Sequence, residues 1–180
     1  TEDLGRGDLT SSSLNKQITT ANWISKQKGV FCGKEIVKLL FKKIDPSLEI
    51  QFFIRDGEGF EANQELLRLK GIPSSLVTGE RTCLNLAMHL SGVATATAEL
   101  VKELEGTGVH LGDTRKTTPG LRVLEKYAFK CGGGINHRLG LDDAAMLKEN
   151  HIAWSGGITA SIKDLKKAIP WSKKIIVEAE

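Results

Sequence analysis

Three short polar stretches carry the side chains best suited to chemistry. They read DTRKTTPG (residues 113–120), CGGGINHR (residues 131–138) and KENH (residues 148–151). The glycines among them let a backbone approach a ligand closely. Clustered cations with glycines predict a pocket for a small, strongly anionic ligand rather than a solvated face. The cationic or potentially cationic side chains are Arg115, Lys116, His137, Arg138 and Lys148.

Composition places the chain among ordinary globular proteins. It has 180 residues, of which 40% are hydrophobic and 26% are charged, enough for one or two modest domains with a core. The net charge of +3 is too small to favour a nucleic-acid partner, so anion binding must come from local clusters. No apolar run approaches the roughly 20 residues of a membrane span, and we expect no membrane association.

The three cysteines favour a reducing compartment. Cys32, Cys83 and Cys131 are odd in number and widely spaced, with no CxxC or Cys/His metal pattern. We interpret them as reduced, mostly buried thiols of a cytoplasmic protein.

The first hundred residues predict mixed α and β structure. After a polar lead-in, residues 21–28 and 48–55 have the composition of strands. Residues 34–43 carry apolar side chains at helical spacing. A long helix is expected over residues 82–104, ended by glycines.

A strand–helix pattern follows. Strands are expected at residues 109–111, 144–147 and 174–180, and helices at 121–130 and 161–169, which is typical of a parallel sheet or barrel. In such folds chemistry gathers at the carboxyl ends of strands. Arg115 and Lys116 follow the first strand and Lys148 the second, whereas Glu178 and Glu180 close the third, so all are expected on one rim.

The predicted fold class is α/β. An N-terminal α/β (α+β) domain with a long connecting helix is expected over residues 1–105. The first half of an incomplete α/β barrel is expected over residues 106–180. Because a closed barrel needs about eight strands, we expect the natural chain to be longer and the catalytic domain's C-terminal part to be missing.

The motifs resemble the quinolinate phosphoribosyltransferase family, also called nicotinate-nucleotide pyrophosphorylase (carboxylating). The matching elements span nearly the whole sequence. They are EDLGRGDLT (2–10), GERT (79–82) with Asn85, DTRKTTPG (113–120), LEKY (124–127), GGG with NHR (132–138), LKENHI (147–152) and VEAE (177–180).

The resemblance implies an enzyme of NAD biosynthesis. It would join quinolinate to phosphoribosyl pyrophosphate with Mg²⁺, giving nicotinate mononucleotide, pyrophosphate and CO₂. It also implies a homodimer in which each active site takes residues from the neighbouring subunit. No protein metal site is expected, because Mg²⁺ would be held mainly by pyrophosphate oxygens and water.

The family substrates suggest a role for each candidate residue. Arg115 and Arg138 would bind the two carboxylates of quinolinate, since guanidinium groups pair with carboxylates in bidentate fashion. His137 would lie beside them and Lys148 would add positive charge. The remaining assignments follow from the resemblance: Lys116 and Thr117 would contact phosphates or a ring carboxylate, Glu180 the ribose and metal region, and Arg81 the quinolinate site across the dimer interface.

Arg81 has a further argument from position. It is expected to open a helix, where its charge would oppose the helix dipole, and this mismatch favours a functional reason for it. His151 is interpreted as a residue that holds the turn at Lys148.

Two other functions stay open. A related phosphoribosyltransferase-like protein could take another acid, such as nicotinate, although paired cations favour a diacid. A non-catalytic, truncated assembly module is the second alternative, because half of the barrel is absent.

Overall fold

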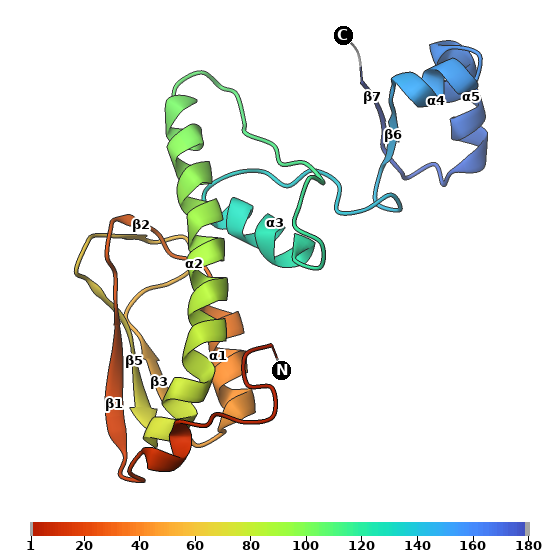
Figure 1. Ribbon diagram of the computed structural model, residues 1–180. Helices are drawn as coiled ribbons and strands as arrows, with labels where there is room; N and C mark the ends of the chain where they lie inside the picture. Colours follow the sequence, from red (N-terminus) through yellow and green to blue (C-terminus); the bar gives the residue numbers. More distant parts are fainter. Residues whose placement is uncertain (1, 179–180) are drawn as a thin grey trace. The chain divides into compact units, whose positions relative to one another are not determined.

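The computed structural model describes residues 2–178 and divides them into two compact units (Figure 1). Unit 1 contains residues up to Asp113 and the stretch Thr118–Asn136. Unit 2 contains Thr114–Thr117 and the residues from His137 onward. The predicted division into domains 1–105 and 106–180 stays a prediction, because compactness alone does not define a domain of the complete fold.

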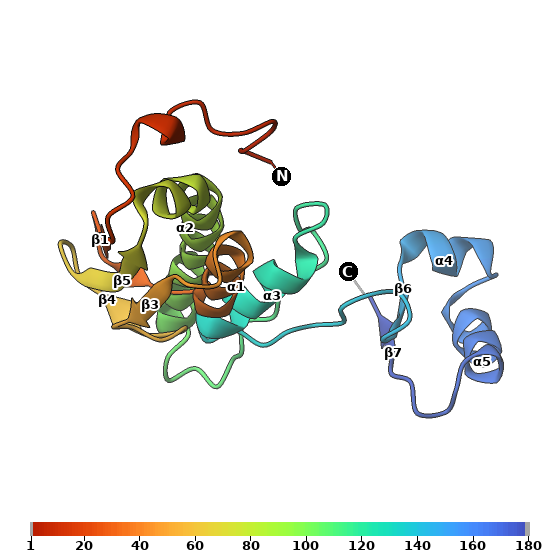
Figure 2. The same ribbon diagram turned by 90° about the horizontal axis from the view of Figure 1, so that it is seen from below.

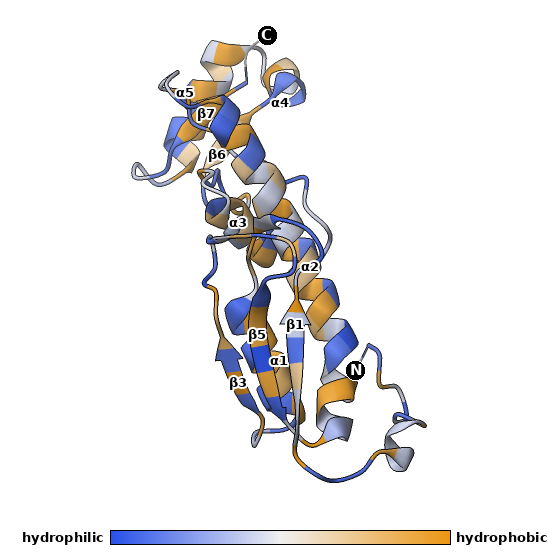
Figure 3. Cartoon of the chain, turned by 90° about the vertical axis from the view of Figure 1, so that its left-hand side faces the viewer, coloured by the Kyte–Doolittle hydropathy of each residue, from blue (hydrophilic) through white to orange (hydrophobic). Residues whose placement is uncertain are grey.

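Unit 1 is built on a three-stranded antiparallel sheet. The strands are β1 (Thr19–Ile24), β3 (Glu49–Phe52) and β5 (Glu65–Gly71), and β5 lies between the other two. Trp23 of β1 and Phe52 of β3 both pair with Leu67 of β5. Apolar and polar residues alternate along the strands (Figure 3), so one face of the sheet is buried.

Two helices cover that face (Figure 2). They are α1 (Lys34–Ile44) and α2 (Pro73–Glu103), and their core side chains include the fully buried Phe41 and Cys83. The helix predicted over residues 34–43 is confirmed. The long helix is confirmed too, but it begins at Pro73, because proline at the first helical turn needs no backbone donor.

The central strand β5 was not predicted. Its sequence, ELLRLKG, is rich in residues with high helix propensity, and only pairing with two neighbours makes it a strand. The first half of the chain also contains three short elements: a 3-10 turn η1 (Ser11–Ser13), β2 (Gly29–Val30) and β4 (Gly59–Phe60). Strands β2 and β4 pair with each other.

Helix α3 (Arg122–Cys131) packs against α2 and completes unit 1. It matches the helix predicted over residues 121–130. The strand predicted over residues 109–111 is wrong: Gly112 forms only an isolated parallel bridge with Ile135. Glycines flank that short segment and Val109 is 58% exposed, so little apolar burial would stabilise a strand.

Unit 2 is a small parallel α/β unit. Strand β6 (Ala145–Leu147) pairs in parallel with β7 (Ile175–Val177). Helices α4 (Glu149–Trp154) and α5 (Ile158–Ala168) connect the two strands. Both strands and α5 were predicted within a few residues, and α4 was not. The parallel strands with a helical connection confirm the predicted α/β class.

Candidate functional site

Six of the seven candidate residues that the structure describes belong to unit 2: Arg115, Lys116, Thr117, His137, Arg138 and Lys148. The seventh, Arg81, belongs to unit 1. Glu180 lies outside the described residues. The two cationic stretches thus join the same compact unit as the parallel strands. Lys148 follows a strand as expected, but Arg115 and Lys116 do not, because the strand predicted over residues 109–111 does not form.

The cationic segment 114–117 is irregular and stabilised by a local turn. The backbone N–H of Lys116 donates to Oγ1 of Thr114 at 3.1 Å. Arg115 and Thr117 are partly buried, whereas the side chain of Lys116 is exposed.

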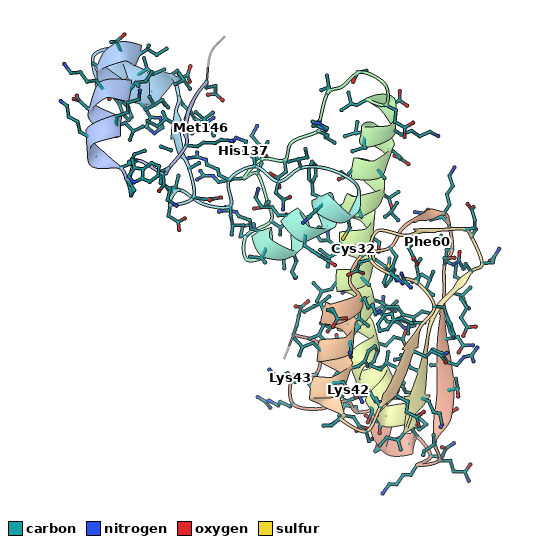
Figure 4. The ribbon with its side chains drawn as sticks, turned by 180° about the vertical axis from the view of Figure 1, so that it is seen from behind. Cys32, Lys42, Lys43, Phe60, His137 and Met146 are labelled. Atoms are coloured by element: carbon teal, nitrogen blue, oxygen red, sulfur yellow. The ribbon has the colours of Figure 1, made fainter. Side chains whose placement is uncertain are left out.

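His137 lies on the irregular segment between α3 and β6 (Figure 4), and Arg138 follows it in the same segment. Nη1 of Arg138 donates to the carbonyl oxygen of Ala144 at 2.8 Å, which fixes part of the guanidinium just before β6 begins. The backbone N–H of Arg138 donates to Nδ1 of His137 at 2.7 Å. A neutral His137 therefore carries its proton on Nε2.

Lys148 lies at the carboxyl end of β6. Its Nζ donates to the two carboxylate oxygens of Glu178 at 3.0 and 3.2 Å, and Glu178 directly follows β7. Both side chains are about half exposed, so the ion pair contributes at most ~1 kcal/mol. Little free energy is therefore lost if another anion replaces Glu178 as the partner of this lysine.

His151 holds the turn at Lys148, as interpreted from the sequence. Its Nδ1 accepts the backbone N–H of Lys148 at 3.2 Å at the start of α4. The side chain of His151 thus caps the start of α4.

The expected position of Arg81 at a helix start is wrong. The helix begins at Pro73, so Arg81 lies inside α2, where the helix dipole acts weakly. The argument from dipole mismatch therefore fails. Its exposure on the helix surface is compatible with contact to a ligand or a second chain.

Sequence reasoning missed a buried polar cluster on α3. Nζ of Lys126 lies 2.6 Å from Oδ1 of Asp113, and these two side chains are only 4% and 7% exposed. Asn136, with its amide nitrogen facing the acceptors, donates to Oδ2 of Asp113 at 3.0 Å and to the carbonyl of Lys126 at 2.9 Å. The signal was the pair of adjacent charges in LEKY, on a helix that otherwise packs against apolar neighbours.

Glu125, the neighbour of Lys126, is buried as well. It accepts the backbone N–H of Thr118 at 2.9 Å and lies 2.7 Å from Nε2 of His89 on α2. Burial raises the pKa of the Glu125 carboxyl, but the hydrogen bonds from Thr118 and His89 outweigh it and hold the pKa below its usual value. Glu125 is therefore ionised at neutral pH.

Tyr127 continues the cluster. Its hydroxyl donates to Oδ2 of Asp56 at 2.9 Å, and Oδ1 of Asp56 accepts the backbone N–H groups of Gly33 and Lys34 at the start of α1. Burial and the hydrogen bond to Asp56 raise the pKa of Tyr127. Residues 125–127 thus connect α3 by hydrogen bonds and an ion pair to α2, to the loop that bonds the start of α1, and to the loop that precedes α3.

The described residues offer no ready-made metal site and no membrane span. Among residues 2–178, no three His, Cys, Asp or Glu side chains are grouped to hold a metal ion. Within the same range, every helix is too short or too polar to cross a bilayer. The three cysteines are free thiols, and burial raises the pKa of Cys83 to about 12.

The chain is an α/β protein in which an antiparallel α+β unit is followed by a parallel unit, with Lys148 at the carboxyl end of β6. Two family models match the sequence: "Quinolinate phosphoribosyl transferase, N-terminal domain" over residues 8–91 and "Quinolinate phosphoribosyl transferase, C-terminal domain" over residues 93–180. The chain belongs to the quinolinate phosphoribosyltransferase family.

Individual relatives agree with this assignment. A probable nicotinate-nucleotide pyrophosphorylase (carboxylating) of Synechocystis is 45% identical over 178 residues, covering 98% of this chain and 60% of that protein. Its counterpart in Bacillus subtilis is 43% identical, covering 99% and 62%. The structure of the nicotinate-nucleotide pyrophosphorylase from Francisella tularensis superposes with a TM-score of 0.96 at 40% identity, covering 99% and 63%. The chain thus spans about three fifths of the length of these relatives.

Proposed function

We propose that the protein containing this chain transfers the phosphoribosyl group of phosphoribosyl pyrophosphate to quinolinate. Decarboxylation would accompany the transfer, and the products would be nicotinate mononucleotide, pyrophosphate and CO₂, in NAD biosynthesis. The observation that carries the proposal is the gathering of six cationic or polar candidates in the unit with the parallel strands. The names of the relatives support the same reaction.

The proposed substrate site pairs opposite charges. Arg115 and Arg138 bind the two carboxylates of quinolinate, with His137 beside them and Lys148 supplying further positive charge. Lys116 and Thr117 contact phosphate or carboxylate oxygens. Glu180 is proposed to bind near the ribose.

Catalysis in this proposal rests on positioning and electrostatics. Positive charge develops at the anomeric carbon of the ribose as pyrophosphate leaves, and the ring nitrogen of quinolinate attacks that carbon. The C–CO₂⁻ bond next to the quaternised nitrogen then breaks and CO₂ departs, leaving its electron pair on the ring carbon, where the adjacent positive charge stabilises it. A proton from solvent then adds to that carbon and gives nicotinate mononucleotide. No nucleophilic side chain is required.

Mg²⁺ is proposed to enter on the pyrophosphate group of the substrate. Oxygen ligands and water suit Mg²⁺, and such a metal needs few ligands from the protein.

We further propose a homodimer with a shared active site, located in the cytoplasm. The exposed position of Arg81 on α2 supports a role toward a second subunit. The free thiols fit a reducing compartment.

A product assay tests the proposed function. The native polypeptide that contains this sequence is incubated with phosphoribosyl pyrophosphate, Mg²⁺ and either quinolinate or nicotinate, and pyrophosphate release is measured. We expect release with quinolinate and little with nicotinate. Release with nicotinate alone would favour the related transferase, and no release with either acid would favour a non-catalytic assembly module.

A further inference from the structure

The cationic segment 114–117 is held at both ends by adjacent residues of one helix. Asp113, just before the segment, forms its ion pair with Lys126. Thr118, just after it, donates its backbone N–H to Glu125. Because the five residue steps from Asp113 to Thr118 span at most about 18 Å, anchoring both ends on α3 restricts where Arg115 and Lys116 can lie.

The second cationic stretch is anchored at the same place. Asn136 immediately precedes His137 and Arg138, and it donates both to Asp113 and to the backbone carbonyl of Lys126. The three residues Asp113, Thr118 and Asn136 are the points where the chain passes between unit 1 and unit 2. All three are therefore bound to residues 125–126 of α3.

The buried charges of this cluster favour a role in holding the backbone in one position. Asp113 and Lys126 are more than nine-tenths buried, and removing a charge from the solvent is costly unless the partner and further hydrogen bonds compensate it. An apolar pair could join α3 to its neighbours without that cost. Charged groups with directional hydrogen bonds fix the position of a backbone more narrowly than apolar contacts do.

We propose that Glu125 and Lys126 are positioning residues for the substrate-binding cations of both stretches. They touch no substrate. They fix the backbone of residues 113–118 and 136–138, so that Arg115, Lys116, His137 and Arg138 meet the anionic substrates in one geometry. The inference deepens the proposed function and rests on it for its catalytic part, whereas the anchoring itself is independent of the reaction.

The experiment compares three variants of the native polypeptide. Lys126→Met removes the charge at the Asp113 end, and Glu125→Gln weakens the Thr118 end with little change of shape. Lys130→Met is the matched control, because Lys130 is an exposed lysine on the same helix. Should Lys126→Met fail to fold, Glu125→Gln decides the outcome alone.

Two readouts are taken. We expect the KM for quinolinate to rise at least tenfold in Lys126→Met and severalfold in Glu125→Gln, with Lys130→Met within twofold of the parent. Amide hydrogen exchange should accelerate in residues 113–118 and 136–138, but not in the buried strand β5, whose exchange reports on general destabilisation.

The inference is overturned by folded variants that keep the parent's quinolinate KM or its exchange in the two segments, or by equal acceleration in β5. If the parent protein itself transfers no phosphoribosyl group to quinolinate, the proposed function fails. The exchange data still decide whether Glu125 and Lys126 anchor the two segments.

Discussion

Several candidate side chains already form hydrogen bonds within the protein. The guanidinium of Arg138 donates one hydrogen bond to the carbonyl of Ala144, and its other N–H groups can donate to a ligand. His137 is oriented by its own neighbour's backbone N–H. Lys148 forms a weak, half-exposed ion pair with Glu178. At this scale Arg138, His137 and Lys148 each have a hydrogen bond that orients the side chain.

Replacing Arg115 by alanine should remove quinolinate binding from the native polypeptide. A bidentate, charge-assisted contact contributes about 3 kcal/mol, so we expect affinity to fall on the order of 100-fold or more. Titration calorimetry with quinolinate measures the change. Arg55→Ala is the matched control, since the side chain of Arg55 is 83% exposed and lies outside the candidate site. Unchanged affinity in Arg115→Ala would exclude Arg115 from the site.

At the scale of elements, α2 is the support on which unit 1 is assembled. Its Gly79 lies against the fully buried ring of Phe41 from α1: a Cβ there would meet Phe41 Cε1 at 2.6 Å and Ile44 Cδ1 at 3.0 Å. Gly92 lies on the same helix with no atom within 4 Å of the corresponding Cβ position. The two glycines therefore have different reasons to be present.

Alanine at these two positions should have opposite effects on stability. Gly79→Ala should lower the free energy of unfolding by about 1–3 kcal/mol, because the buried ring cannot move aside freely. Gly92→Ala should raise it by roughly 0.5–1 kcal/mol, since alanine has the higher helix propensity. Urea denaturation followed by circular dichroism provides both values. Equal effects of the two changes would mean that α1 and α2 do not pack as described.

At the scale of the whole molecule, the sequence predicted what depends on local pattern. Helices α1 and α3 and strands β6 and β7 have clear periodicity and appear where expected. The central strand β5 did not, because its leucines and charges favour a helix until two neighbouring strands pair with it. The strand at residues 109–111 failed for the opposite reason: its residues favour a strand but bury too little.

For the candidate site, too, local pattern could be read from the sequence and tertiary contacts could not. Cationic residues beside glycines stand out in a sequence, so Arg115, Arg138 and Lys148 could be named in advance. The contacts of Asp113 with Lys126 and of Thr118 with Glu125 depend on how α3 folds back on the loop before it, and no spacing rule gives them. The position of Arg81 inside α2 likewise depends on where the helix begins.

The proposed transfer with decarboxylation is tested most directly by following the quinolinate carboxylate next to the ring nitrogen. The native polypeptide is given phosphoribosyl pyrophosphate, Mg²⁺ and quinolinate labelled in the carboxylate next to the ring nitrogen, and released CO₂ is counted. The account predicts one labelled CO₂ for each nicotinate mononucleotide and each pyrophosphate formed. Retention of the label in the product, or no labelled CO₂ at all, would contradict it.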